Sequence, residues 1–329
     1  MNHVAGTMTG AYITECGPPE NIRIGKFEIP VPGATEVLVR SEAMAVNHVD
    51  TFIRSGAYRT NLPFPFIIGR DLVGTVERAG ERVAGFTPGD RVWCNSLGYD
   101  GRQGSFAEYA VIAADRLYHL PGGVSPAEAA AVLHTAATAH IGLFREARIR
   151  FGETIVVFGA AGGVGSAVVQ LAAATGARVI AVARAGQADW CRACGAEQAL
   201  DAGDPALTKV IADLVPDGVA VLWDTTGTHD LTSTLPLLAR GGRIIAMAGL
   251  SATPVLPAGQ LYTRDASIRG FVITNASTAD LASAARTVNH GLATGILKPR
   301  IAERLPLTDA ANAHRHQESG VRGRIVVLP

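Results

Sequence analysis

The sequence has few cysteines, few aromatic residues and no excess of charge of either sign. Only 4 of its 329 residues are cysteine, which excludes a disulfide scaffold and favours a reducing compartment. Lysine and arginine together number 29, as do aspartate and glutamate, so the formal net charge is zero. This balance argues against a nucleic-acid-binding protein and against a polybasic membrane-surface protein, since both carry a basic excess.

Long apolar runs are also missing. The longest uncharged apolar stretch, Ala129–Phe144, contains two histidines and is shorter than the roughly 18 residues that a spanning helix needs. The N-terminus has no basic segment followed by an apolar run, so no signal peptide is predicted. The sequence therefore predicts a cytoplasmic protein with no membrane or nucleic-acid partner.

Apolar residues make up 48% of the chain, which is long enough for about two domains with substantial cores. In the first 125 residues, short β-type runs such as Glu36–Arg40 and Leu72–Glu77 alternate with Gly- and Pro-rich turns. This pattern predicts a partly closed antiparallel barrel. From Thr154 onward, apolar strands alternate with helices, which predicts a parallel sheet buried on both faces.

The helix starts are marked by capping residues. Ser125, Pro126 and Glu128 have the N-cap, first-turn and capping-box spacing of a helix start, and the pattern predicts one alanine-rich helix from Ser125 to about Arg148. Further along, the pattern predicts strand Thr154–Phe158, a helix over about Val164–Thr175, and strand Arg178–Ala183.

A glycine-rich turn lies between that first strand and helix. Ala160-x-Gly162-x-x-Gly165 is a variant of the dinucleotide fingerprint, in which Gly162 lets the backbone approach a pyrophosphate and Gly165 lets the helix pack against the strand. The helix N-terminus then directs free N–H groups at the phosphate. The predicted cofactor contacts are Ala161, Gly162, Gly163, Val164 and Gly165. The alternative is a glycine turn without a ligand.

The end of the second strand bears on cofactor choice. A site for NAD would place a carboxylate there for the ribose 2′-hydroxyl, about 20 residues beyond the glycines. Here the strand ends in Arg184, whose guanidinium would instead bind a 2′-phosphate. We therefore expect NADPH rather than NADH, the alternative being that Arg184 is a solvated loop residue.

Together, several segments resemble a known family over nearly the whole chain. They are Ala45–Tyr58, Pro65–Val76, Gly89–Val92, Gly104–Tyr109, Gly159–Gly165 and Gly323–Val327. The sequence resembles the medium-chain dehydrogenase/reductase superfamily, in its zinc-independent NADPH:quinone oxidoreductase branch. The resemblance implies a GroES-like β-barrel catalytic domain (residues 1–125 and 275–329) and a doubly wound Rossmann domain (residues 126–274). It also implies an active site in the cleft between them and a homodimer formed through the Rossmann sheet edges.

The zinc ligands of related enzymes are missing at the matching positions. Zinc members of the superfamily have Cys where this chain has Asn47, a His-Glu pair where it has Arg70 and Asp71, and Cys where it has His134. An arginine cannot ligate zinc, and catalytic zinc needs three protein ligands. Cys94 stands alone, without a structural-zinc lobe, so no metal site is predicted.

The expected chemistry is hydride transfer without a metal to a quinone or another conjugated carbonyl, an enone or enal. The predicted catalytic residues are Asn47, Tyr58 and His134. Asn47 would donate to the acceptor oxygen or orient the cofactor, unless it only caps a turn. Tyr58 would donate a hydroxyl or form an aromatic wall, unless it only packs on the neighbouring loop. His134 would protonate the product, unless it is a buried structural histidine.

Other residues are assigned with the same resemblance in view. Asp50 and Arg54 are expected to form a structural pair. Further cofactor contacts are expected at Asn47, Thr138, Thr226, Gly249, Phe271 and Arg324.

Cys191 and Cys194, three residues apart on a predicted helix, are expected to pack as small apolar residues rather than to act as a redox pair. Two alternatives stay open for the whole protein. It could reduce enoyl thioesters or 2-alkenals on the same fold, or it could bind NADPH without catalysis.

Overall fold

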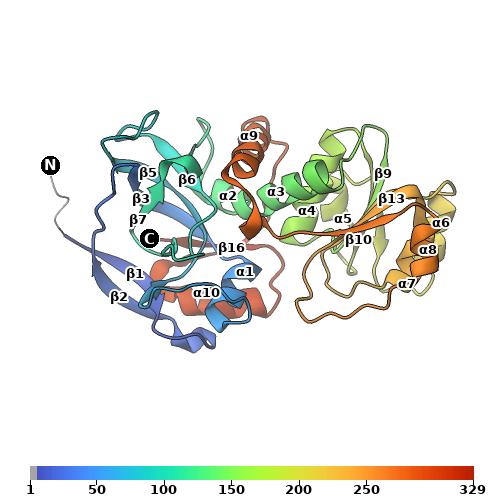
Figure 1. Ribbon diagram of the computed structural model, residues 1–329, viewed down its shortest axis with the longest axis horizontal. Helices are drawn as coiled ribbons and strands as arrows, with labels where there is room; N and C mark the ends of the chain where they lie inside the picture. The colour runs from blue at the N-terminus through green and yellow to red at the C-terminus, as the bar shows by residue number, and fades with distance from the viewer. Residues whose placement is uncertain (1–5) are drawn as a thin grey trace. The chain divides into compact units, whose positions relative to one another are not determined.

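The computed structural model describes residues 6–329, which divide into two compact units (Figure 1). The first unit runs to His134 and resumes at Ser277–Pro329, and the second is Thr135–Ala276. The predicted α/β class, with a mainly antiparallel unit and a parallel-sheet unit, is confirmed. No helix within residues 6–329 is long and apolar enough to cross a membrane.

The first unit is built on two sheets. The larger has the order β15-β16-β3-β5-β6-β8, with β7 also paired to β3, and the smaller has the order β2-β1-β4. All these pairs are antiparallel except β15 with β16. The strands are β1 (Thr7–Ile13), β2 (Arg23–Glu28), β3 (Glu36–Ala45), β4 (Phe66–Ile67), β5 (Asp71–Ala79), β6 (Arg91–Cys94), β7 (Tyr109–Ala113), β8 (Tyr118–His119), β15 (Ile301–Pro306) and β16 (Arg324–Leu328).

The helices of the first unit are short, apart from α9, which has 17 residues. They are α1 (His48–Ser55), α2 (Pro126–Ala130), α9 (Thr278–Thr294) and α10 (Ala310–Glu318), with 3-10 turns at Pro19–Asn21, Ala114–Arg116 and Leu307–Asp309. α2 packs against β3 and β5, and its Ala129 and Ala130 are fully buried. This packing makes α2 part of the first unit.

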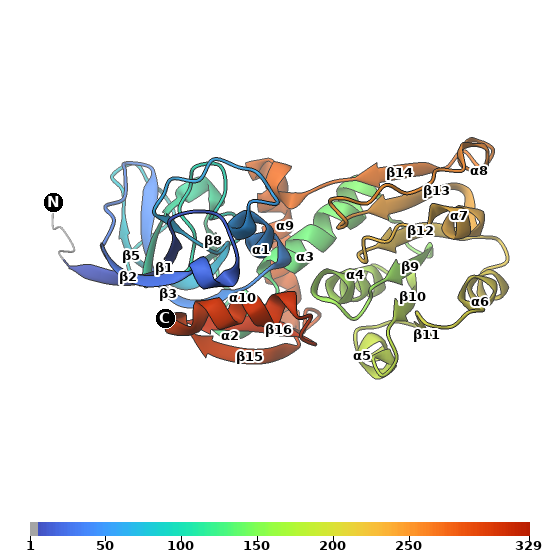
Figure 2. The same cartoon turned by 90° about the horizontal axis from the view of Figure 1, so that it is seen from below.

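The second unit is a six-stranded parallel sheet with the order β11-β10-β9-β12-β13-β14. Figure 2 shows α4 and α6 on opposite sides of this sheet, as expected of a doubly wound fold. The strands are β9 (Thr154–Phe158), β10 (Arg178–Ala183), β11 (Gln198–Asp201), β12 (Val219–Asp224), β13 (Leu238–Ala246) and β14 (Ser267–Gly270). The helices are α4 (Gly163–Ala174), α5 (Ala188–Ala193), α6 (Leu207–Leu214), α7 (Leu231–Thr234) and α8 (Ala258–Tyr262), with 3-10 turns at Leu235–Leu237 and Ile273–Asn275.

The single helix predicted from Ser125 to about Arg148 is wrong. The segment forms α2, then α3 (Leu133–His140), then a π-helix over Ile141–Glu146. At the break, the carbonyl of Ala131 accepts a hydrogen bond from Nε of Arg324 at 3.0 Å. At the widened turn, Gly142 lies against Trp223 so closely that a Cβ would come within 2.0 Å of the indole ring. Both features depend on residues distant in sequence.

The strands and the helix predicted around the glycine-rich turn of the second unit agree with the structure. β9 and β10 have the predicted bounds, and α4 begins and ends within one residue of the prediction. Cys191 and Cys194 form no disulfide and both are buried, in agreement with the expectation that they pack as small residues.

Candidate cofactor and active site

The turn between β9 and α4 is shaped by glycine backbone. Gly159 has φ of 72°, in the left-handed region that glycine adopts at little cost. A Cβ on Gly165 would lie 2.2 Å from the carbonyl oxygen of Gly159, whereas a Cβ on Gly162 would meet only that same oxygen, at 3.2 Å. Gly165 is therefore required by helix packing. Gly162 is less crowded, since the Gly159 oxygen is the one atom that a Cβ there would approach, and this position corresponds to the fingerprint glycine at which a pyrophosphate comes close.

The loop after β12 is tied to the end of β9. Oγ1 of Thr225 donates to the carbonyl oxygen of Phe158 at 2.9 Å. The chain order of the strands reverses between β9 and β12, and ligands of doubly wound sheets bind outside the carboxyl ends of the strands at this point. The phosphate turn and the Thr225 loop therefore flank the expected dinucleotide site.

On the other side of β9, Arg184 directly follows β10 and is exposed. Its chain neighbours Ala183 and Ala185 carry no charge, and the nearest strand end across the sheet is that of β11, where Asp201 is paired with Ala183. The guanidinium of Arg184 can accept a 2′-phosphate.

The first unit contains a buried polar cluster, which we call the Asn47 cluster: Asn47, Asp50, Arg70, Asp71 and Arg324. Each of these side chains is at most 7% exposed. Nδ2 of Asn47 donates to Oδ2 of Asp71 at 2.9 Å, and Nη2 of Arg324 donates to Oδ1 of Asn47. The amide is thus fixed in orientation by an acceptor at its nitrogen and a donor at its oxygen.

Asp50 is held by the start of α1. The backbone N–H of Asn47 donates to Oδ2 of Asp50 at 2.7 Å, an exchange typical of a capping box. The predicted pair between Asp50 and Arg54 is wrong, because Arg54 forms its ion pair with Glu318 on α10 instead. The three-residue spacing of Asn47 and Asp50 was the signal that could have shown this in the sequence.

Burial dominates the ionisation of the cluster. It raises the pKa of Asp50 to about 6, against the opposing effect of the Asn47 backbone hydrogen bond. It raises the pKa of Asp71 to about 7, with hydrogen bonding by Asn47 opposing it and the charge of Asp50 adding to it. Burial, together with the charges of Arg70 and Arg324, lowers the pKa of His134 well below its usual value. His134 is therefore neutral at pH 7, which favours its structural alternative over proton donation.

The structure distributes the predicted site residues over both units. Asn47, Tyr58, His134 and Arg324 belong to the first unit, and Thr138, Ala161–Gly165, Arg184, Thr226, Gly249 and Phe271 belong to the second. Tyr58 is half-buried, with its ring centroid 5.9 Å from that of Tyr99. Phe271 packs edge-on against Trp223, at 6.1 Å between centroids. Gly249, in the left-handed region, lies against Gly227.

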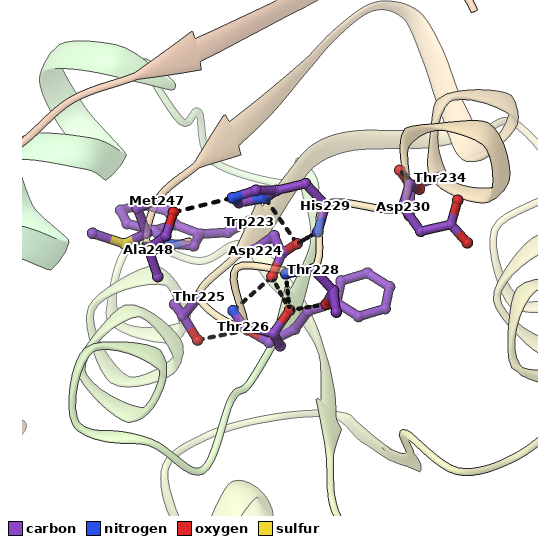
Figure 3. Close-up of polar contacts among 11 residues, drawn as sticks. Trp223, Asp224, Thr225, Thr226, Thr228, His229, Asp230, Thr234, Met247 and Ala248 are labelled. Atoms are coloured by element: carbon purple, nitrogen blue, oxygen red, sulfur yellow. Dashed lines mark hydrogen bonds and ion pairs between the residues drawn. The ribbon is translucent and has the colours of Figure 1, made fainter. Parts of the chain in front are cut away.

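Sequence reasoning missed two groups of polar residues. It weighed Arg70 and Asp71 only as failed zinc ligands, although a charged pair inside the apolar run around β5 is itself a signal of a buried polar site. It also missed Asp224 and His229, which meet next to Thr226 at the end of β12 (Figure 3).

The donor set of the Asn47 cluster does not fit a metal ion. The amide of Asn47 is already bonded at both ends, and two guanidinium groups lie within the cluster. Within residues 6–329, no group of three or more His, Cys, Asp or Glu side chains is placed to hold a metal.

A dinucleotide-type Rossmann unit with a mainly antiparallel partner unit defines the class of a two-domain dehydrogenase or reductase. Two family models match the chain: "Alcohol dehydrogenase GroES-like domain" over residues 33–122 and "Zinc-binding dehydrogenase" over residues 163–289. The second description does not extend to a metal at the Asn47 cluster, for the reason just given.

Comparison with individual proteins narrows the class. The mouse (Mus musculus) quinone oxidoreductase is 32% identical over 328 residues, covering 98% of each chain. The crystal structure of Escherichia coli quinone oxidoreductase complexed with NADPH superposes with a TM-score of 0.86 at 26% identity, covering 98% of this chain and 100% of that one. A crystal structure of an NAD-dependent alcohol dehydrogenase superposes at 0.88, with 32% identity and coverage of 98% and 99%. The chain belongs to the quinone oxidoreductase family of the medium-chain dehydrogenases/reductases.

Proposed function

We propose that this protein is an NADPH-dependent oxidoreductase that transfers a hydride, without a metal ion, to a quinone or another conjugated carbonyl acceptor. The observation that carries the proposal is the β9–α4 turn, where a Cβ on Gly162 would meet a single protein atom, the Gly159 carbonyl oxygen at 3.2 Å, so that one side of this glycine faces no protein atom within 4 Å. A turn kept open in this way fits a bound dinucleotide phosphate. The E. coli relative, crystallised with NADPH, supports the choice of cofactor.

Arg184 supports the same choice through its charge. It is exposed at the end of β10, where an NAD site would carry a carboxylate of the same strand. We therefore assign it to the 2′-phosphate of NADPH, with Gly162–Gly165 at the pyrophosphate.

In this proposal, the Asn47 cluster supplies the hydrogen-bond donor for the oxygen of the acceptor. Bound NADPH supplies the hydride. One N–H of the Asn47 amide donates to Asp71, and we assign the second as the donor to the acceptor's developing oxyanion. Asp71 and Arg324 hold that donor in place, which removes the cost of orienting it during the reaction.

An acceptor whose product anion is delocalised suits a single neutral donor. A quinone or enone spreads the added charge over several atoms, so it needs less stabilisation at oxygen than an isolated carbonyl does. The relatives named quinone oxidoreductase support quinones within this class.

The test is a panel of acceptors assayed with purified protein and each reduced cofactor. A naphthoquinone, a 2-alkenal and a crotonyl thioester are supplied with NADPH or with NADH, and cofactor oxidation is followed. We expect the largest kcat/KM for the quinone with NADPH. A preference for the alkenal or thioester would replace the acceptor assignment, and binding of NADPH with no turnover of any acceptor would overturn the assignment as a reductase.

We also propose a homodimer joined through the β14 edge of the sheet. β14 is the last strand of its sheet, and the adjoining segment exposes large apolar residues: Leu250 at 61%, Val255 at 76% and Tyr262 at 73%. Such exposure is typical of an interaction surface. Light scattering should give twice the chain mass for the wild type and a shift toward the monomer for Val255→Asp; a monomeric wild type would refute the proposal. A cytoplasmic location is proposed because none of the four cysteines forms a disulfide.

A further inference from the structure

A buried carboxylate organises the loop that follows β12. Asp224 is 7% exposed and accepts hydrogen bonds from the loop around it. Its Oδ1 accepts from the backbone N–H and from Oγ1 of Thr226, each at 2.7 Å. Its Oδ2 accepts from the backbone N–H of His229 at 3.0 Å. The carboxylate therefore fixes the loop from Thr226 to His229.

The His229 ring extends this order to the next loop. Nδ1 lies 3.1 Å from Oδ2 of Asp224, and Nε2 lies 3.3 Å from the carbonyl oxygen of Ala248, beyond the end of β13 (Figure 3). A carbonyl oxygen only accepts hydrogen bonds, so Nε2 carries the hydrogen. The imidazole, 9% exposed, thus connects the loops that follow two neighbouring strands.

The backbone conformation at His229 disfavours a residue with a side chain. His229 has φ of 46°, in the left-handed region, where a residue with a side chain pays about 1 kcal/mol or more and glycine pays little. Ala248, its partner, is also left-handed at 68°. Backbone strain held by surrounding contacts is common at functional sites. Glycine would adopt this backbone conformation more easily, so we attribute the presence of histidine to the contacts of its ring.

At Gly227 and Gly249 the two loops approach each other through backbone alone. A Cβ on Gly249 would lie 2.5 Å from the carbonyl oxygen of Gly227. The loops therefore approach as bare backbone, and the His229 ring is the side-chain link between them in the contacts described for this part of the chain.

The position of these loops indicates which part of a dinucleotide they face. Along the sheet the order is β10, β9, β12, β13, with Arg184 after β10 and the phosphate turn after β9. If the 2′-phosphate end lies over β10 and the pyrophosphate over β9, the other half of the cofactor extends over β12 and β13. That half carries the nicotinamide.

We propose that His229 is a positioning residue for the nicotinamide half of NADPH, acting through its hydrogen bond to the Ala248 carbonyl. The proposal rests on the proposed function only in its choice of cofactor. His229 itself does not touch the reacting atoms in this account. It holds the Ala248–Gly249 backbone in the conformation that the nicotinamide half binds.

Three substitutions separate the ring's two contacts. His229→Gln places an amide nitrogen near the position of Nε2 and so keeps a donor for Ala248. His229→Asn has a side chain too short to reach the Ala248 carbonyl, leaves a polar amide beside Asp224 and tolerates a left-handed backbone. His229→Gly eases the backbone and removes both contacts. Arg148→Gly is the matched control, since Arg148 is also left-handed (φ of 49°) but precedes β9, at the amino ends of the strands.

The readout is the Kd of each full-length variant for two ligands: NADPH and 2′-phospho-ADP-ribose, which is NADP without its nicotinamide ring. We expect Gly and Asn to raise the Kd for NADPH about 5- to 15-fold, the effect of one lost neutral hydrogen bond. The Kd for 2′-phospho-ADP-ribose should stay within about 2-fold, Gln should recover most of the NADPH affinity, and Arg148→Gly should change neither Kd by more than about 2-fold.

Two results would overturn the proposal: unchanged NADPH affinity in His229→Gly, or equal weakening of both ligands, which would indicate general disruption of the unit. Neither depends on turnover. A wild type that binds NADPH but reduces no acceptor would refute the proposed reductase activity and leave the test of His229 intact.

Discussion

The β9–α4 turn and the Asn47 cluster are built in opposite ways. The turn is made of backbone: its function depends on side chains that are missing, and a single Cβ at Gly165 would collide with the Gly159 carbonyl at 2.2 Å. The Asn47 cluster is made of charged and amide side chains, all buried, which compensate one another. If the proposed roles hold, cofactor binding depends on the shape of the backbone, whereas the action on the acceptor depends on a balance of buried charges.

The largest expected effect comes from removing one charge of the cluster. Arg324→Leu leaves Asp50 and Asp71 with Arg70 as their cationic neighbour and frees Oδ1 of Asn47. Removing a buried cation near two buried carboxylates should cost about as much as removing one partner of a buried ion pair, about 3–5 kcal/mol of unfolding free energy. Urea unfolding at pH 7.5 measures it.

Arg315→Leu is the control for that experiment. Arg315 pairs with Glu20 at 2.9 Å, but both side chains are largely exposed, so its loss should barely move the urea midpoint. Equal midpoints for the two variants would show that burial of the cluster has no energetic consequence.

The next effect tests the shape of the turn. Gly162→Ala adds a Cβ 3.2 Å from the Gly159 oxygen, a tight contact that a shift of a few tenths of an ångström relieves, and this Cβ occupies the proposed approach to the pyrophosphate. NADPH affinity should fall on the order of 100-fold with little change in melting temperature. Gly165→Ala should instead lower the melting temperature, since the clash is internal. Matching behaviour of the two variants would contradict the separate roles given to these glycines.

Arg184→Ala removes charge from the cofactor region without touching its shape. A charge-assisted hydrogen bond contributes about 1.5–3 kcal/mol, so NADPH affinity should fall roughly 10- to 150-fold. NADH, which has no 2′-phosphate, should bind the variant as it binds the wild type. Titration of both cofactors measures the difference, and an unchanged NADPH affinity would remove Arg184 from the site.

A smaller effect concerns a buried titratable group outside the cluster. His314 is fully buried, and within the described residues neither ring nitrogen has a hydrogen-bond partner. Burial lowers the pKa of His314 to about 3, so the unfolded chain binds this proton more readily than the folded protein. Stability from His314 is complete above about pH 6.5 and falls as the pH decreases toward 3, with about 2 kcal/mol lost by pH 5.

His314→Leu should remove this dependence. The difference in unfolding free energy between pH 8 and pH 5 should be about 2 kcal/mol smaller in the variant. An identical pH dependence in both proteins would mean that His314 is not buried as a neutral ring.

The two regions also differ in how far the sequence predicted them. β9, the turn and β10 lie within one continuous segment, so apolar runs and glycine spacing were sufficient to place them. The Asn47 cluster joins residues from α1, β5 and β16, and the break of the predicted long helix at Ala131 depends on Arg324. Such contacts arise from the tertiary fold, and spacing along the chain does not encode them. For the same reason Arg54 was paired with Asp50, its helix neighbour, although its partner Glu318 is distant in sequence.

The most direct test of the central claim is a single-turnover measurement on Asn47→Ala. Protein loaded with NADPH is mixed with a quinone, and the hydride-transfer rate is compared with that of the wild type and of Asn95→Ala, which removes another buried amide of the same unit. The account predicts a rate about 10- to 100-fold lower for Asn47→Ala, the effect of one lost donor to a developing oxyanion, with the Kd for NADPH within about 3-fold of wild type. An unchanged rate, or a rate loss matched by an equal loss of NADPH affinity, would contradict the claim that the Asn47 amide acts on the acceptor.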